Sequence, residues 1–94
     1  MSPEQVNEIL TMCEASAGEG GFRDLPPKTT LSLYLARNGV GMTVGSIEAL
    51  ALKGLSVQAR TTKGEIYVFA LEDVFVANVE GKAQSKTTRR AGFA

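Results

Sequence analysis

Histidine is absent from this 94-residue sequence, and cysteine occurs only once, as Cys13. Without histidine, the chain cannot form a Ser-His triad, a Cys-His nucleophile or a Cys/His zinc site. A single cysteine excludes an intramolecular disulfide. The carboxylates suggest no general acid/base pair either, because Glu72-Asp73 is typical of a turn. We therefore expect no enzymatic activity, no bound metal and no other cofactor.

An excess of charge is also missing, since ten Lys and Arg balance ten Asp and Glu. A net charge of zero argues against a strongly basic nucleic-acid-binding protein, although a local basic patch could still exist. The sequence has no run of 18 apolar residues and no basic, then apolar, segment at its N-terminus. We expect a soluble, cytoplasmic protein without a membrane partner.

The first part of the chain predicts one helix, residues 3–17, followed by a linker, residues 18–28. Ser2 can cap the helix, Pro3 suits its first position, and Gln5 completes a capping box. One apolar stripe follows at helical spacing, and we interpret its cysteine as a small buried hydrophobe: Val6, Ile9, Leu10, Cys13 and Ala17. In residues 18–28 the glycines and the two prolines predict irregular structure.

From residue 29 onward, apolar residues alternate with polar ones, which predicts strands. Asn38-Gly39 is a strong two-residue hairpin signal. The next run, 40–52, is too long for a flat strand, and Gly45 in its centre predicts a sharp bend. Further strands are expected at 55–61, 65–71 and 74–79. The predicted fold is mainly β: an N-terminal helix, then a five-stranded, strongly bent antiparallel SH3-like barrel over 29–80 and a flexible basic tail over 81–94.

Two stretches, LSLYLARNGVGMTVGSIEALAL and EIYVFALEDVFVANV, carry a family resemblance. The first matches alternating apolar residues, an Asn-Gly pair and a later glycine; the second matches two apolar strands separated by a very short break. Roughly residues 2–79 therefore resemble the Sm-like family, which includes the Sm and LSm proteins and bacterial Hfq, and we expect residues 1–80 to form an Sm-like domain. The resemblance implies an Sm-type barrel.

In that family, the fourth strand of one subunit pairs with the fifth strand of the next, and the subunits close a ring. The corresponding strands here, 65–71 and 74–79, are almost continuously apolar and contain no proline. We expect a homo-oligomeric ring; the alternative is a monomer whose helix covers one face of these strands. The candidate interface residues are Ile66, Val68, Phe69, Leu71, Val74, Phe75 and Val76.

The resemblance also implies binding of single-stranded RNA around the centre of the ring. The family's pocket is not reproduced, because Ala51 stands near its Asp position and Gly54 or Leu55 near its Asn position. Val68, Phe69 and Ala70 replace the Tyr-Lys-His of Hfq. The remaining candidates for stacking on bases or contacting phosphate are Tyr34, Arg37, Asn38, Lys53, Arg60 and Lys63. For each charged candidate the alternative is a solvated charge on a turn, and for Tyr34 it is packing.

Three hypotheses for function follow. The first is a ring-forming Sm-like protein that binds single-stranded RNA without altering it. The second is a structural or assembly module that keeps the ring but has lost the RNA-binding pocket. The third is an SH3-like adaptor that binds another protein through its barrel edge.

Overall fold

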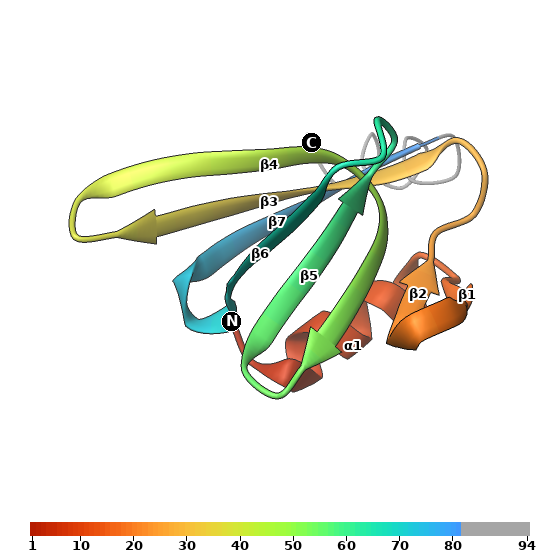
Figure 1. Cartoon of the computed structure of the whole chain (residues 1–94), viewed down its shortest axis with the longest axis horizontal. Coiled ribbons are helices and arrows are strands. Elements are labelled where there is room, and N and C mark those ends of the chain that lie inside the picture. The colour runs from red at the N-terminus through yellow and green to blue at the C-terminus, as the bar shows by residue number, and fades with distance from the viewer. Residues whose placement is uncertain (82–94) are drawn as a thin grey trace, which may run out of the picture.

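The structure is a computed structural model and describes residues 1–81, so the expected tail beyond Gly81 lies outside the described residues. A single helix, α1 (Pro3–Met12), precedes the strands (Figure 1). The elements that follow are β1 (Ser16–Ala17), η1 (Glu19–Gly21), β2 (Phe22–Asp24), β3 (Thr29–Arg37), β4 (Val40–Lys53), β5 (Ser56–Thr61), β6 (Ile66–Ala70), η2 (Leu71–Asp73) and β7 (Val74–Gly81).

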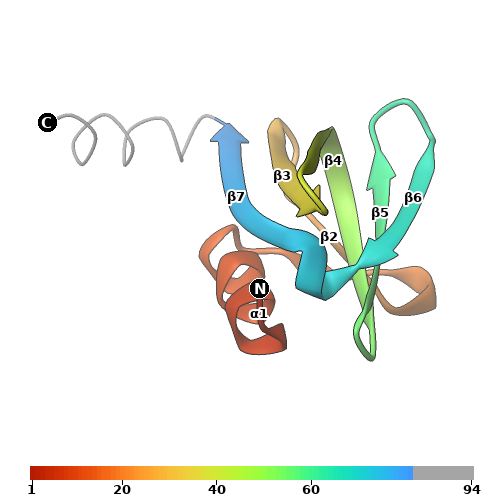
Figure 2. The same cartoon turned by 90° about the vertical axis from the view of Figure 1, so that its left-hand side faces the viewer.

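The five longer strands form one bent antiparallel sheet in the order β7-β3-β4-β5-β6 (Figure 2). The first half of β4 pairs with β3, and its second half pairs with β5. The prediction of a mainly β fold with an N-terminal helix and a bent antiparallel sheet is confirmed. The sheet is not closed into a barrel, however, because none of the described strand pairs joins β6 to β7.

The bend in β4 comes from a bulge next to Gly45. Leu33 pairs with Val44 but Leu31 pairs with Ile47, so β4 carries one more residue than β3 at this point. The left-handed conformation lies at Ser46, whose φ is 57°, and not at Gly45. A bulge of this kind bends the strand and increases its twist, which explains how one strand serves two neighbours.

The turn between β3 and β4 is the expected two-residue hairpin turn. Asn38 and Gly39 both have positive φ, at 53° and 81°. This pattern fits a type I′ turn, whose twist matches that of the flanking strands. The hairpin end of β3 and β4 extends beyond the rest of the sheet (Figure 1). We call this part of the two strands, with the turn at Asn38 and Gly39, the arm.

Helix α1 begins as predicted and ends earlier than predicted. The Ser2 hydroxyl accepts a hydrogen bond from the Gln5 amide, and the Gln5 side chain accepts one from the Ser2 amide, which is a complete capping box. The helix ends at Met12 and not at Ala17. There the Glu14 amide donates to the Thr11 carbonyl and the Ala15 amide to the Leu10 carbonyl. This is a Schellman motif.

We expect Glu14→Gly to stabilise the protein. Glu14 occupies the left-handed position of that motif, with φ of 62°, where glycine is the favoured residue. Removing the strain outweighs the extra freedom of glycine in the unfolded chain by about 0.5–1 kcal/mol. Thermal unfolding followed by circular dichroism should show a higher Tm for Glu14→Gly, while Glu14→Ala, which keeps the strain, should gain nothing. A lower Tm for the glycine variant would contradict this account of the helix end.

The expected irregular linker, residues 18–28, contains one short strand, β2, and the last two residues of the expected helix form another, β1. Antiparallel pairing joins β2 to residues Ala49–Ala51 of β4, and β1 pairs with β2. This pairing covers an edge of the second half of β4, beyond the bend at which β3 leaves it. The strands are only two and three residues long, too short to produce a periodic pattern in the sequence.

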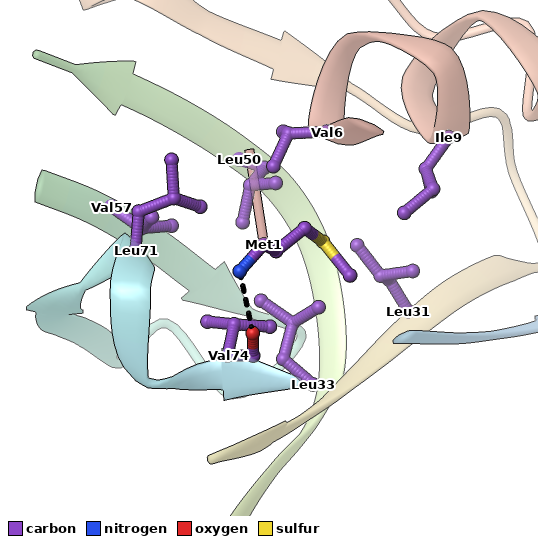
Figure 3. A pocket seen from close by; sticks show the side chains of 9 residues that line it. All are labelled: Met1, Val6, Ile9, Leu31, Leu33, Leu50, Val57, Leu71 and Val74. Carbon is purple, nitrogen blue, oxygen red and sulfur yellow. Dashed lines mark hydrogen bonds between the residues drawn. The ribbon is translucent and has the colours of Figure 1, made fainter. Parts of the chain in front are cut away.

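The concave side of the sheet forms the core, and α1 covers one end of it. Figure 3 shows side chains of the helix meeting those of the sheet and of η2. The large, fully buried side chains are Leu31, Ile47, Leu50, Val57, Leu71 and Val74. Cys13 is buried beside them, and burial raises the pKa of its thiol. A neutral thiol is a poor nucleophile, which agrees with our interpretation of Cys13 as a core residue.

Candidate functional site

Exposed apolar side chains gather on the two end strands of the sheet. Among the described residues, nine large apolar side chains are exposed. Five of the nine lie on β6 or β7: Ile66, Tyr67, Val68, Phe75 and Val76. Clustered exposed apolar residues mark interaction surfaces more often than scattered ones do. These two strands are therefore the candidate functional site.

The outer edge of β6 has unpaired backbone groups in the described part of the chain. The Leu71 amide donates to the Leu55 carbonyl, and the Thr61 amide donates to the Glu65 carbonyl. Because bonding direction alternates along an antiparallel strand, the amides of residues 67 and 69 also point toward β5. The amides of Ile66 and Val68 then point away from the sheet and are available to another strand.

The β7 strand lies at the opposite end of the sheet, and within residues 1–81 β3 is the only strand that pairs with it. Val74 lies opposite Leu35 while Val76 lies opposite Tyr34, so Phe75 is an extra residue in a second bulge. The bulge leaves Phe75 61% exposed. A phenylalanine this exposed on an end strand of the sheet is a natural anchor for association.

The seven candidate interface residues differ in exposure and fall into three groups. Ile66, Val68, Phe75 and Val76 are exposed, and Phe69 is partly buried at the margin of the core. Leu71 and Val74 are buried in the chain's own core, at 1% and 2% exposure. The reason is η2, which turns the chain so that these two side chains point beneath α1 (Figure 3). They stabilise the monomer and are not available to a partner.

Arg60, a candidate for phosphate contact, lies in an ion-pair network within the chain. Its Nε is 3.0 Å from Glu48 Oε2, and its Nη2 is 3.2 Å from Asp24 Oδ1. The guanidinium also lies 5.3 Å from the centre of the Phe22 ring. The hydrogen bond to Glu48 is the main cause that raises the pKa of Arg60 above its ordinary value. Arg60 thus joins β2, β4 and β5.

Arg37 is engaged in a similar way at the arm. Its Nε donates to Asp73 Oδ2 at 2.9 Å, and Glu72 Oε2 lies 3.6 Å from its Nη2. The hydrogen bond to Asp73, followed by the negative charge of Asp73, raises the pKa of Arg37. These contacts tie the arm to η2.

The other RNA-binding candidates do not converge. Asn38 forms the turn at the tip of the arm, and Lys53 ends β4, where its Nζ donates to the Gly20 carbonyl at 3.1 Å. Lys63 lies in the β5–β6 turn, and Tyr34 is partly buried in β3. Figure 1 shows the three turns at separate points of the molecule. The six candidates therefore form no single basic or aromatic surface.

The charge of the folded part also disfavours phosphate binding. Residues 1–81 contain six Lys and Arg but all ten Asp and Glu of the chain. The remaining four cations, Lys82, Lys86, Arg89 and Arg90, lie outside the described residues.

Among residues 1–81, no group of three or more Cys, Asp or Glu could hold a metal ion. No helix in that same part of the chain is long and apolar enough to cross a membrane.

Sequence reasoning missed the inner face of the arm. Val40 and Met42 are 70% and 55% exposed there, beside Leu35 and Phe69. The only sign of this surface in the sequence is the alternation of apolar residues at the start of β4. The alternation indicates an exposed face only when the structure shows that the arm extends beyond the other elements of residues 1–81.

No protein-family model, curated protein or solved structure matches this chain.

Proposed function

We propose that this protein is a self-associating module in which β6 of one copy pairs with β7 of the next. The observation that carries the proposal is the exposure of apolar side chains on the two strands at opposite ends of one sheet. Each strand has one edge without a strand partner among the described residues. An exposed edge with no proline and with apolar side chains pairs readily with another strand.

The two edges differ, so the contact joins unlike surfaces. Such a head-to-tail contact repeats until it closes into a ring or grows into a fibre. The Sm-like resemblance favours closure, because β6 and β7 correspond to the fourth and fifth strands that join neighbouring subunits in that family. We therefore propose an Sm-type homo-oligomeric ring whose role is structural.

Light scattering coupled to size-exclusion chromatography tests this function on the full chain. One chain has a mass of 10.0 kDa. The proposal predicts one discrete mass that is an integer multiple of this value and stays constant over a tenfold change of concentration. A mass of 10.0 kDa throughout would contradict the proposal and favour the adaptor hypothesis. A mass that grows without limit would contradict the ring.

Binding of single-stranded RNA is a second candidate, and the charge distribution along the sequence favours the tail, residues 82–94, as the part that binds it. Four of the last 13 residues are Lys or Arg and none is Asp or Glu. Lys and Arg bind phosphate without sequence preference, and a ring would multiply the four charges by its subunit number. This candidate does not depend on the pocket that the family uses.

We expect neutralisation of the tail to weaken RNA binding, and substitution of Arg60 to leave it unchanged. In the tail variant, Lys82, Lys86, Arg89 and Arg90 become Gln; in the matched control, Arg60 becomes Met. Fluorescence anisotropy with labelled oligo-U should show at least a tenfold loss of affinity for the tail variant at low salt, because phosphate contacts dominate such binding. If Arg60→Met causes the larger loss, the folded part carries the RNA site and this assignment is wrong.

A further inference from the structure

A groove lies between the arm and the end of β6. Its lining comes from both strands of the arm, from β6 and from η2: Leu35, Ala36, Arg37, Val40, Met42, Phe69 and Asp73. Leu35 lies opposite Met42 and Arg37 lies opposite Val40 in the arm, so each pair shares one face. Leu35 is a core residue, which makes this the concave face of the sheet. Helix α1 covers the other end of that face (Figure 1).

The groove is continuous with the open edge of β6, because Phe69 contributes to both. If a strand adds to this edge in the antiparallel sense seen throughout the sheet, its C-terminal end lies beside Ile66 and its N-terminal end beside Ala70. When that strand is β7 of another copy, its first residues arrive next to Phe69. Phe75 is the second residue of β7, so a register that sets the start of β7 beside the end of β6 brings it to the mouth of the groove.

The apolar area that a stable contact must bury also indicates that the groove belongs to the interface. A stable interface buries at least about 1,000 Å² in total, of which roughly 60% is apolar. The five exposed side chains of β6 and β7, at roughly 60–130 Å² each, supply about 500 Å². Val40 and Met42 are the exposed apolar residues next to this edge. Including them brings the apolar area to about 700 Å², as in an interface of stable size.

We propose that Phe75 of one copy occupies the groove of the next copy, where it packs on Met42, Val40 and Phe69. This inference rests on the proposed self-association and names the anchor and its pocket. The occupant is a second copy of this chain because the same register that pairs the two open edges delivers Phe75 to the groove. Phe75 then supplies the aromatic contact at the centre of the interface.

The test uses two charge substitutions in the full chain, one on each side of the contact. Phe75→Asp and Met42→Asp should each weaken association at least tenfold, because each places a carboxylate in an apolar contact. Met12→Asp on α1 and Leu55→Asp in the β4–β5 turn are matched controls, since both residues are similarly exposed and lie away from the groove. The controls should keep the mass of the unmodified protein. Circular dichroism checks that every variant folds; Phe75→Ser and Met42→Ser replace any variant that does not.

Mixing the two defective variants gives the sharper result. The Met42→Asp chain has an intact Phe75, and the Phe75→Asp chain has an intact groove. Phe75 of the Met42→Asp chain can therefore enter the intact groove of the Phe75→Asp chain. In the opposite contact, the substituted residue 75 would meet the substituted groove, so that contact cannot form. The mixture should therefore form a one-to-one dimer and stop there.

The outcomes separate the two proposals. If the unmodified chain assembles but both Asp variants keep its full mass, or if the mixture forms no dimer, the groove assignment is overturned and self-association stands. If the unmodified chain stays at 10.0 kDa, self-association fails and the groove assignment fails with it. A groove that binds an unrelated peptide while F75D assembles normally would also overturn the assignment.

Discussion

Val68→Pro is expected to reduce the assembly to single chains of 10.0 kDa at micromolar concentration. The Val68 amide points away from β5, so proline removes a donor from the open edge and leaves the β5–β6 ladder intact. The lost hydrogen bond and the steric clash of the ring with an incoming strand together cost about 2–3 kcal/mol at each contact. That corresponds to roughly 30–150-fold weaker binding.

Val68→Thr is the matched control, because threonine is also β-branched and keeps the amide donor. It should retain the mass of the unmodified chain. Val68 is 62% exposed and lies opposite Gln58, on the outer face of the sheet, so neither change reaches the core. If the proline variant unfolds, Val68→Lys provides the same test through a charge at the edge. A folded Val68→Pro that keeps its full mass would show that β6 is not a contact strand.

Ser46→Val is expected to destabilise the fold by about 1–2 kcal/mol. Ser46 holds the left-handed conformation at the β4 bulge, which is strained for any residue with a Cβ and most strained for a β-branched one. Its carbonyl accepts a hydrogen bond from the Thr62 amide at 2.9 Å, so the conformation is fixed by the β5–β6 turn. Thermal unfolding should show a Tm lower by roughly 4–16 °C.

Two neighbouring substitutions distinguish the bulge at Ser46 from Gly45, the residue at which the sequence predicts the bend. Ser46→Gly should raise the Tm, since glycine adopts positive φ without strain. Gly45→Ala should change it little, because Gly45 has no positive φ and an added Cβ would lie 3.4 Å from the Ser32 Oγ. If Gly45→Ala is the more damaging change, the bend depends on Gly45 and our description of the bulge is wrong.

Local signals in the sequence predicted the local features of the fold. The capping box at Ser2 and the Asn38-Gly39 turn both appear as expected, because each depends only on residues within one turn of chain. The bend near Gly45 was also predictable, since a run of apolar residues this long cannot stay flat in a small domain. The residue that takes the strained conformation, Ser46, was not, because serine has no special preference for it.

Features that depend on distant parts of the chain were not predictable. Whether the sheet closes depends on small twist angles summed over five strands, and no residue pattern encodes that sum. Nor does a continuously apolar run show which residues face inward, which is why Leu71 and Val74 appeared among the interface candidates. The sequence does not reveal the ion pairs of Arg60 either, because its partners Glu48 and Asp24 lie 12 and 36 residues away.

The central claim, that β6 and β7 of different copies pair, is tested most directly by amide hydrogen exchange at single-residue resolution. Below the concentration at which chains associate, the amides of Tyr67 and Phe69 should be protected by β5, while those of Ile66 and Val68 exchange freely. Above it, the account predicts that Ile66 and Val68 become protected as well, at the concentration at which the mass rises. Exchange at Ile66 and Val68 that does not change as the mass increases would contradict the claim.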